Sequence, residues 1–260
     1  MAYTAFDLKG KVALVTGGNG GIGLGMAEAM AQAGADVCIW GTNEEKNRAA
    51  AERLQPHGTR VLALRCDVSD EAAVDRSFAE TLTRLGRVDG CFANAGVIGT
   101  NKRFHELKHD DWSGVMDVNL DGLFYTLRAA AKHMVERGDK GDKGGRLVGV
   151  SSLGALCGMA RSEPYAASKG AIISLMQALA VMYARYGVTA NSILPGHIET
   201  AMTEQTYQRE KFVDAVMPRI PARRWGTPAD FGGIAVYLMS DASAYHTGDK
   251  FLIDGGFFLA

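Results

Sequence analysis

Short apolar segments alternate with longer helical segments along almost the whole chain of 260 residues. The apolar segments are rich in Val, Ile and Leu and lack the polar alternation of a half-exposed strand, which is typical of strands that helices cover on both faces. Strict alternation of strand and helix predicts parallel strands joined by right-handed crossovers. We therefore expect an α/β fold built on a doubly wound parallel sheet of about seven strands, with helices on both faces.

The expected elements follow one another without an internal repeat or a linker. We expect strands at Lys11–Thr16, Asp36–Trp40, Arg60–Arg65, Val88–Ala93, Arg146–Ser151, Val188–Leu194 and Lys250–Ile253. We expect helices at Ile22–Ala33, Glu44–Leu54, Glu71–Leu85, Asp111–Glu136, Pro164–Tyr186 and Pro228–Ser240. The absence of a linker predicts that residues 1–260 form a single domain.

Two segments lie outside this alternation. Residues 199–222 contain no strand and are long for a simple connection, so we expect them to form a lid over the substrate. The polar stretch Arg137–Gly145 is expected to be a solvated loop on the face away from the ligand. In an open sheet of this kind, ligands bind beyond the carboxyl ends of the strands.

Composition excludes several classes of protein. Lys and Arg number 28 against 29 Asp and Glu, so the basic excess of a nucleic-acid binder is missing. The longest uncharged apolar stretch, Gly170–Ala184, is shorter than the ~18 residues that span a bilayer, and the first residues show no secretory signal. We expect a cytoplasmic protein without membrane association. Cys38, Cys66 and Cys91 lie in or beside apolar runs and predict core packing, with no metal or redox motif.

The first strand leads into a glycine-rich turn at the start of a helix. Gly18, Gly20 and Gly23 match the pattern G-x-G-x-x-G, and Gly17, Gly21 and Gly23 match a wider spacing. Such a turn lets the backbone approach a pyrophosphate, and the helix start supplies N–H donors and a positive dipole end. This position predicts a Rossmann-like dinucleotide site.

The end of the second strand bears on the choice between NAD and NADP. NAD sites usually carry an Asp or Glu here for the ribose 2′-hydroxyl, but this strand ends Trp40-Gly41-Thr42-Asn43. The missing acid favours NADP(H) over NAD(H), although the usual Arg is missing too. Thr42 and Asn43 are candidates for the 2′-phosphate, with Lys46 nearby. Alternatively, Thr42 or Asn43 only caps the following helix.

Six motifs in order make the chain resemble the classical short-chain dehydrogenase/reductase family. These are Thr16-Gly17-x-x-x-Gly21-Ile22-Gly23, Asn94-Ala95-Gly96, Asn119, Ser152, Tyr165-x-x-x-Lys169 and Pro195-Gly196-x-Ile198-x-Thr200. The resemblance implies an enzyme that transfers a hydride between a nicotinamide cofactor and a secondary alcohol or ketone. Relatives often carry a second Asn at Ala93 and a different residue at His197, which leaves the substrate open.

The resemblance implies four catalytic residues. Tyr165 exchanges a proton with the substrate oxygen, and Lys169, on the same helix face, is expected to lower the tyrosine pKa and to reach the ribose. Ser152, rather than the adjacent Ser151, would steady the developing alkoxide. Asn119 would hold a water on the proton path, or alternatively bend its helix as a structural Asn.

The resemblance also implies a set of cofactor contacts. They are Gly17, Asn19, Gly21, Ile22, Gly23, Thr42, Asn43, Asp67, Val68, Asn94, Ala95, Gly96, Tyr165, Lys169, Pro195, Gly196, Ile198 and Thr200. Asp67 is placed to accept from the adenine amino group, and its alternative is to cap its own loop. Asn94 is expected to fix the turn beside the cofactor, and its alternative role is purely structural.

Residues expected to face the substrate are mostly apolar. They are Gly154, Leu156, Cys157, Met159, His197 and Met202. This set suits a small-molecule alcohol or ketone, and 3-oxoacyl-carrier-protein reduction is the alternative within the class. An alternative of another class is a non-catalytic cofactor sensor, which would not need the complete set of Ser152, Tyr165 and Lys169.

Two further features concern metals and assembly. His105-Glu106-x-x-His109 matches a zinc-protease pattern, but it lies in a connection and lacks a third ligand, so no metal site is expected. The family commonly forms dimers or tetramers. The apolar tail Phe257-Phe258-Leu259-Ala260 is consistent with a subunit contact in a homo-oligomer.

Overall fold

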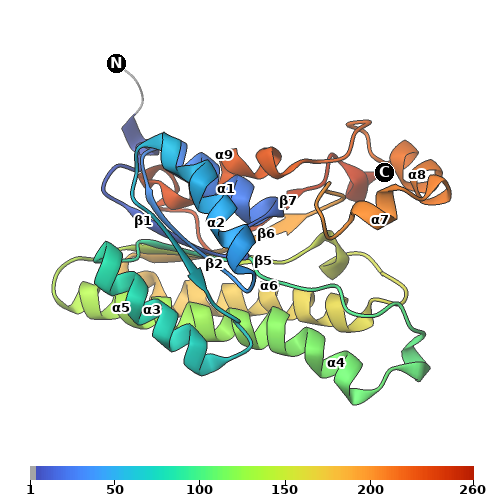
Figure 1. The fold of residues 1–260 in the computed structure, drawn as a ribbon, viewed down its shortest axis with the longest axis horizontal. Coiled ribbons are helices and arrows are strands. Elements are labelled where there is room, and N and C mark those ends of the chain that lie inside the picture. Colours follow the sequence, from blue (N-terminus) through green and yellow to red (C-terminus); the bar gives the residue numbers. More distant parts are fainter. Residues whose placement is uncertain (1–3) are drawn as a thin grey trace.

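The computed structural model describes residues 4–260 and contains one seven-stranded parallel sheet (Figure 1). The strand order is β3-β2-β1-β4-β5-β6-β7, which confirms the predicted doubly wound fold. The strands are β1 (Val12–Thr16), β2 (Asp36–Gly41), β3 (Val61–Arg65), β4 (Gly90–Ala93), β5 (Gly145–Val150), β6 (Val188–Pro195) and β7 (Lys250–Ile253). The order reverses between β1 and β4, where a ligand cleft is expected.

Helices cover both faces of the sheet in two layers, which lie above and below it in Figure 1. One layer holds α1 (Gly21–Gln32), α2 (Glu44–Leu54) and α9 (Gly232–Met239). The other holds α3 (Glu71–Leu85), α4 (His109–Met116), α5 (Gly122–Asp139) and α6 (Glu163–Tyr183). Each layer excludes water from one face of the strands.

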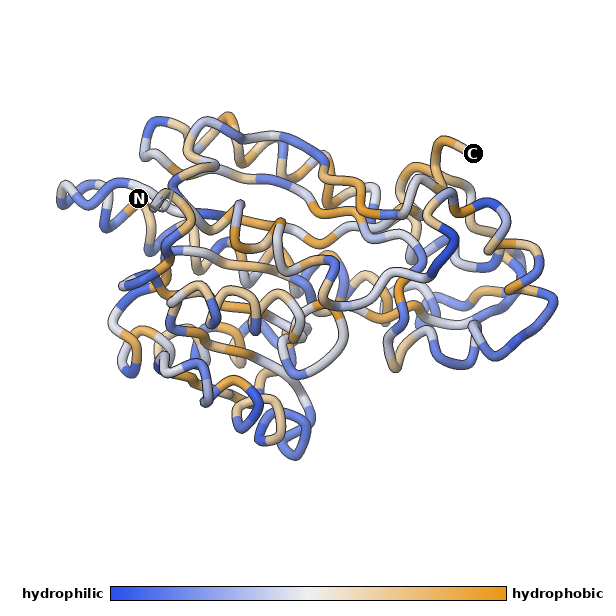
Figure 2. Tube along the Cα trace, turned by 90° about the horizontal axis from the view of Figure 1, so that it is seen from above, coloured by the Kyte–Doolittle hydropathy of each residue, from blue (hydrophilic) through white to orange (hydrophobic). Residues whose placement is uncertain are grey.

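Successive residues of a strand pack alternately into two separate apolar cores. Val12 and Leu14 pack in the core beneath α3, α5 and α6, whereas Ala13 and Val15 pack in the core beneath α1 and α9. Cys38 and Cys91 belong to the first core and are fully buried, as predicted. Because both cores need apolar partners, the strands read as continuous hydrophobic runs. Figure 2 shows the trace as mainly hydrophobic through the middle and hydrophilic at the outer loops.

The single helix predicted over Asp111–Glu136 is wrong in its bounds and its regularity. A π-helical segment, Asp117–Asp121, separates α4 from α5. Asn119 in this segment turns its side chain to the backbone of Val97 and to Ser168, and such tertiary bonds are what a π-bulge accommodates. Similarly, the helix predicted at Pro228–Ser240 begins with a 3-10 turn, Pro228–Phe231, before α9.

The predicted solvated loop at Arg137–Gly145 is also wrong in part. α5 continues to Asp139, and the Arg137 side chain is only 13% exposed. Its guanidinium donates to the Val88 carbonyl oxygen at 2.9 Å and to Asp89 at 3.0 Å. These partners come from a neighbouring strand and its approach, so local polarity alone did not reveal the burial.

The segment after β6 forms two short helices, α7 (Glu204–Tyr207) and α8 (Glu210–Val216), and a 3-10 turn, Met217–Arg219. It lies beside the C-terminal end of the described chain (Figure 1). A third apolar cluster joins the two, with Val216 and Ile220 packed against Leu153 and Phe257. The segment expected to be a lid is therefore anchored at its far end.

One helix within residues 4–260, Glu163–Tyr186, is long and apolar enough to span a membrane by length and composition alone. The uncharged stretch within it, Gly170–Ala184, is shorter, because the longer helix includes Glu163 and Lys169. The helix comprises α6 and the 3-10 turn that follows it, and it packs against β5 and β6. Its apolar character thus serves at least partly as the cover of one face of the sheet.

Candidate active site

A cleft of about 330 Å³ opens at the carboxyl ends of β1, β4, β5 and β6. It is lined by Gly17, Asn19, Gly20, Gly21, Ile22, Lys46, Asn94, Ala95, Gly96, Ile98, Val150, Ser151, Ser152, Tyr165, Lys169, Pro195, Gly196, Ile198, Thr200, Ala201, Met202 and Thr203. The cleft therefore brings together residues from five of the six motifs that carry the family resemblance, and Asn119 is the motif residue outside its lining. The cleft also lies between β1 and β4, where the strand order of the sheet reverses. Ligands bind at such a point in open α/β sheets.

The glycine-rich turn forms one wall of the cleft. Gly17 has φ 61° and Gly21 has φ 50°, conformations that L-residues with a side chain rarely adopt. A Cβ atom at Gly23 would collide with the carbonyl oxygen of Gly17 and with the Asn94 amide. The turn is thus compact because side chains are absent, and α1 starts directly at Gly21.

Asn94 joins the turn after β4 to the turn after β1. The Thr16 hydroxyl accepts the backbone N–H groups of Asn94 and Ala95 at 3.0 Å each. The Asn94 amide donates to the Thr16 carbonyl oxygen at 3.0 Å. These bonds fix the relative position of two walls of the cleft, as expected for Asn94.

Ser152 and Ser151 differ in what their hydroxyls contact. Ser152 accepts the Gly154 N–H at 3.0 Å and lines the cleft together with Tyr165. Ser151 instead donates to the Lys169 carbonyl oxygen at 2.7 Å, which ties β5 to α6. Of the two serines, Ser151 therefore has its hydroxyl proton committed to the backbone.

Tyr165 and Lys169 lie on the same face of α6, with the Lys169 ammonium 5.6 Å from the centre of the Tyr165 ring. Lys169 is only 4% exposed and donates to the Val150 carbonyl oxygen at 2.8 Å. Burial lowers the pKa of Lys169 to about 8. The amine is thus held near the tyrosine and titrates close to physiological pH.

The structure does not show the expected lowering of the tyrosine pKa. Burial raises the pKa of Tyr165, and the hydrogen bond with Ser152 only partly opposes that effect. The cause is that the phenolate loses hydration in a site that offers it little compensation. Tyr165 is therefore a neutral phenol at neutral pH.

Asn119 is fully buried beside Lys169. A Cβ atom at Gly96 would lie 3.1 Å from the Asn119 oxygen and 3.4 Å from the Lys169 ammonium, so three motifs meet at this point. The Asn119 side chain accepts the Val97 N–H at 2.7 Å and donates to Ser168 at 3.2 Å. Its amide therefore positions the cleft wall behind Lys169.

Four residues expected at the adenosine end lie outside the cleft lining. Asn43 accepts the Lys46 N–H at 2.9 Å, so it caps α2, and Thr42 is exposed. Asp67 accepts the backbone and hydroxyl of Ser69, so it caps its own loop. Val68 packs against the Gly122 backbone, where a Cβ atom would collide with it.

The end of β2 is closed to a larger side chain. A Cβ atom at Gly41 would collide with the side chains of Asn19 and Asn47. Asn19 donates to Asn47 at 2.7 Å, and Asn47 donates to the Gly41 carbonyl oxygen at 2.9 Å. A carboxylate at this position would therefore displace a side chain that lines the cleft.

Most residues expected to face the substrate lie outside the cleft lining. Met202 lines it, whereas Gly154, Leu156, Cys157 and Met159 do not. The His197 ring lies in an aromatic cluster, with ring centres 4.7 Å from Phe257 and 5.9 Å from Trp225. Burial lowers the pKa of His197, so the ring is held neutral within apolar surroundings.

Several lining residues were absent from the expected contacts. Lys46 was expected near the 2′-phosphate, Ser151 was the adjacent alternative to Ser152, and Gly20 belongs to the same glycine-rich turn. The others are Ile98, Val150, Ala201 and Thr203. Thr203 donates to the Ile198 carbonyl oxygen at 2.7 Å and pairs with the Thr200 hydroxyl at 3.1 Å. These residues lie next to the motif residues in the sequence, and this adjacency was the signal that could have identified them.

The zinc-protease pattern is split between two elements. His105 lies in the 3-10 turn Phe104–Glu106, and His109 begins α4. Within residues 4–260, no group of three or more His, Cys, Asp or Glu side chains is placed to hold a metal ion. The pattern therefore lacks the common helix face that its chemistry needs.

Comparisons with known proteins agree with this geometry. Residues 17–258 match the model of a family described as enoyl-(acyl carrier protein) reductase. The chain is 35% identical to 2-dehydro-3-deoxy-D-gluconate 5-dehydrogenase of Escherichia coli (strain K12), over 98% of each chain. It is 35% identical to the 3-oxoacyl-[acyl-carrier-protein] reductase of Chlamydia pneumoniae, over 96% of this chain and 97% of that protein.

A solved structure shows the same fold with a bound cofactor. The gluconate 5-dehydrogenase of Burkholderia cenocepacia J2315, in complex with NADP and tartrate, aligns with a TM-score of 0.91 and 35% identity over 98% of each chain. The fold, the cleft and these matches define a nicotinamide-dependent oxidoreductase. The chain belongs to the short-chain dehydrogenase/reductase family.

Proposed function

We propose that the cleft binds NADP(H) and that Tyr165, Ser152, Lys169 and Asn119 serve the interconversion of a secondary alcohol and a ketone. The observation that carries this proposal is that Ser152 and Tyr165 line the same cleft as the buried Lys169, whose ammonium lies 5.6 Å from the centre of the Tyr165 ring. A cofactor sensor has no need of such an arrangement. The turn of Gly17, Gly21 and Gly23 is a cradle that side chains would fill, which fits a pyrophosphate.

The chain's own groups divide the work of proton transfer and charge stabilisation. When bound, the nicotinamide supplies or accepts the hydride. Tyr165 donates a proton to the substrate oxygen during reduction and recovers it during oxidation. Ser152 donates a hydrogen bond to the same oxygen as negative charge develops there. Lys169 stabilises the transient phenolate, because a cation favours the charged form of a neighbouring phenol.

NADP(H) is favoured over NAD(H) by the adenosine end of the cleft. Gly41 leaves no room for a carboxylate that would repel a 2′-phosphate. Lys46, in the first turn of α2, lines the cleft and carries the positive charge that such a phosphate needs. NADP in the Burkholderia relative supports the same choice. Thr42 and Asn43 remain candidate hydrogen-bond donors beside it.

The substrate that we propose is a small polyhydroxy acid of the gluconate type. Relatives named for gluconate and its dehydro derivatives align over nearly the whole chain. Thr200 and Thr203 line the cleft with Ser152, and their hydroxyl groups suit a polyol. The sequence proposed further substrate contacts, which would influence the substrate indirectly through the residues packed on them. These are Gly154, Cys157, Met159 and His197.

A second candidate is reduction of 3-oxoacyl groups on a carrier protein. The Chlamydia relative carries that name, and Ile98 and Met202 add apolar surface to the cleft. The two candidates differ in whether the substrate is a free hydroxy acid or a thioester.

A substrate panel tests the proposal. The purified enzyme would be assayed with NADP⁺ and gluconate, with NADPH and 5-ketogluconate, and with NADPH and acetoacetyl-carrier protein. We expect turnover of the sugar acids, and a loss of about 10²- to 10³-fold for Ser152→Ala with little change for Ser151→Ala. Turnover of the thioester alone would replace the first candidate with the second, and equal losses for both serines would contradict the role of Ser152.

We also propose a cytoplasmic homo-oligomer, a dimer or a tetramer, with residues 199–222 acting as the lid. Val181 and Met182 on α6 are 84% and 58% exposed, and Leu259 is 88% exposed. Apolar side chains of this size gain by burial against a second copy. Light scattering would test the assembly, and a monomeric mass would contradict it.

A further inference from the structure

We infer that a second pocket, at the amino end of the sheet, binds a phosphate-bearing anion. This pocket, which we call the basal pocket, has a volume of about 360 Å³. It lies beside Gly10, which precedes β1, and Gly144, which precedes β5. β5 leads from this pocket at Arg146 to Ser152 at the catalytic cleft, a span of roughly 20 Å at 3.3 Å per residue. The two sites are therefore separate.

The lining of the basal pocket carries a surplus of positive charge. Its cationic side chains are Lys9, Lys11, Arg87, Arg137, Lys143 and Arg146. Asp89 and Asp142 neutralise two of them, because Asp89 pairs with Arg87 at 2.6 Å and Arg137 pairs with Asp142 at 2.9 Å. Asp241 is the remaining acid in the lining, and it contacts two of the other four cations, Lys11 and Arg146. A net charge of +3 therefore remains without a balancing group among the lining residues.

Arg146 is the residue of the basal pocket whose charge and hydrogen-bond donors most require a ligand. Its side chain is 9% exposed, and it donates to the carbonyl oxygens of Ser240 at 3.0 Å and Gly145 at 3.0 Å. Counting the longer bond from its Nε to Ser240, two of its five N–H groups have no acceptor within residues 4–260. A buried guanidinium with idle donors is costly, and an anion would satisfy both the charge and the donors.

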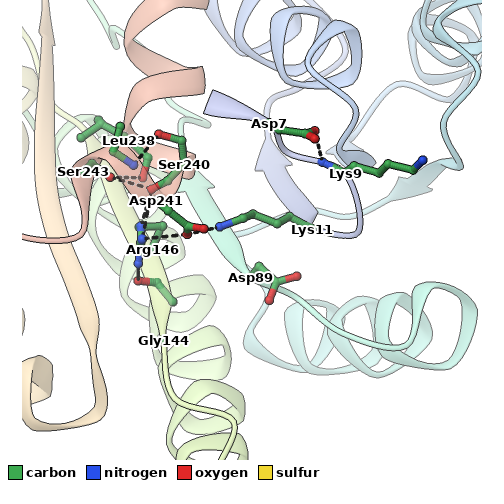
Figure 3. Close-up of polar contacts among 12 residues, drawn as sticks. Asp7, Lys9, Lys11, Asp89, Gly144, Arg146, Leu238, Ser240, Asp241 and Ser243 are labelled. Carbon is green, nitrogen blue, oxygen red and sulfur yellow. Dashed lines mark hydrogen bonds and ion pairs between the residues drawn. The ribbon is translucent and has the colours of Figure 1, made fainter. Parts of the chain in front are cut away.

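The acid nearest to Arg146 does not neutralise it. Figure 3 shows the Asp241 carboxylate between Arg146 and Lys11. Asp241 is 71% exposed, lies 3.7 Å from the guanidinium and forms a closer ion pair with Lys11. Burial lowers the pKa of Arg146 despite this neighbour. One exposed carboxylate is thus shared between two cations, which leaves positive charge beside the opening of the pocket.

Lys9 and Lys143 add mobile charge at the rim. Both are exposed, and neither ammonium has an ion-pair partner in the part of the chain that the structure describes. Lys9 extends away from Asp241 in Figure 3, so its flexible side chain is free to turn toward a ligand. A planar, buried Arg with flexible Lys residues around it suits a phosphate group, which accepts several charge-assisted hydrogen bonds.

The ligand class follows from these groups. A phosphate carries the two negative charges and the several acceptor oxygens that Arg146, Lys11 and Lys143 require. The volume of about 360 Å³ accommodates more than the phosphate itself. Inorganic phosphate and a nucleoside monophosphate share this chemistry and are distinguished by experiment.

The test is calorimetric titration of the full-length enzyme saturated with NADPH, which fills the catalytic cleft. Inorganic phosphate and adenosine 5′-monophosphate are the probes, with chloride used to hold the ionic strength constant. We expect phosphate to bind, and Lys143→Ala and Arg146→Lys each to weaken it by about tenfold. Lys132→Ala is the matched control, because Lys132 is an exposed lysine on α5 outside the pocket, and it is expected to bind as the wild type does.

Lys143→Ala keeps the test decisive if Arg146→Lys fails to fold, because Lys143 is exposed and unpaired among the described residues. Tighter binding of the monophosphate than of phosphate would identify an ester as the ligand, and equal binding would identify the free anion. Absence of phosphate binding to the wild type, or equal binding by wild type, Lys143→Ala and Arg146→Lys, would overturn the inference.

Discussion

Asn119 and Val97 exchange two hydrogen bonds: the Asn119 oxygen accepts the Val97 N–H at 2.7 Å, and its amide donates to the Val97 carbonyl oxygen at 2.9 Å. This pair fixes the chain after β4 against the π-helical segment between α4 and α5. At Gly96 an added Cβ atom would lie 3.1 Å from the Asn119 oxygen and 3.4 Å from the Lys169 ammonium, so the pair also sets the wall beside the ammonium. The buried Asn119 is thus a positioning residue as well as a proposed catalytic one.

Replacement of Asn119 by Ala leaves both backbone groups of Val97 without these partners. We expect a loss of about 2–3 kcal/mol in the free energy of unfolding, because unmade buried hydrogen bonds are costly. Ser168→Ala removes one partner of Asn119 and leaves the Val97 pair intact, so about 1 kcal/mol is expected. Urea denaturation of both variants measures the difference, and equal losses would contradict the pairing.

Lys169 gives a prediction on pH and stability. Its folded pKa is about 8, below the ~10.4 of an exposed lysine, so folding releases its proton between these values. The cost of burying the charge is therefore complete below pH 8 and disappears as the pH rises toward 10.4. Without cofactor, Lys169→Met is expected to be more stable than wild type by about 3 kcal/mol at pH 7, and nearly equal at pH 10.5.

The measurement is the free energy of unfolding of both proteins at several pH values. A stability difference that does not change between pH 7 and pH 10.5 would mean that Lys169 is not buried as a charge. Lys169→Met is also expected to lose activity, because the buried Lys169 serves the reaction although it lowers the stability of the fold.

Gly23→Ala tests the close packing of the glycine-rich turn. The added methyl group would collide with the Gly17 carbonyl oxygen and the Asn94 amide, so the turn must shift. We expect at least tenfold weaker binding of NADPH by fluorescence titration. Gly114→Ala on α4 is the control, because nothing lies within 4 Å of its added Cβ atom. A normal dissociation constant for Gly23→Ala would show that the turn does not hold the cofactor.

Lys46→Ala tests the preference for NADP(H). Loss of the cation that lines the cleft is expected to weaken NADPH about tenfold and to leave NADH unchanged. Arg48→Ala, on the same helix but outside the cleft lining, is the matched control. Equal effects of Lys46→Ala on both cofactors would remove the 2′-phosphate from this position.

Sequence patterns predicted the features that depend on local order. The alternation of strands and helices gave the sheet, and the spacing of Tyr165 and Lys169 on one helix gave a shared face that the structure confirms. Ser151 commits its hydroxyl proton to the Lys169 carbonyl oxygen, which is consistent with the choice of Ser152 as the serine of the site.

Features that depend on distant partners escaped prediction. The π-helical segment exists because Asn119 bonds to Val97 and Ser168, which lie far away in sequence. His197 follows a cleft motif, yet aromatic rings from the lid segment and the C-terminal end surround it. The raised pKa of Tyr165 results from burial, which spacing along a helix does not reveal.

The most direct test of the central claim is the comparison of Tyr165→Phe with wild type. The phenol is proposed to transfer the proton, so its loss is expected to lower kcat by about 10²- to 10⁴-fold. The Tyr165 ring stays in place in this variant, so the dissociation constant of NADPH is expected to remain within about twofold of wild type. A variant that binds NADPH normally and still turns over at the wild-type rate would contradict the proposed mechanism.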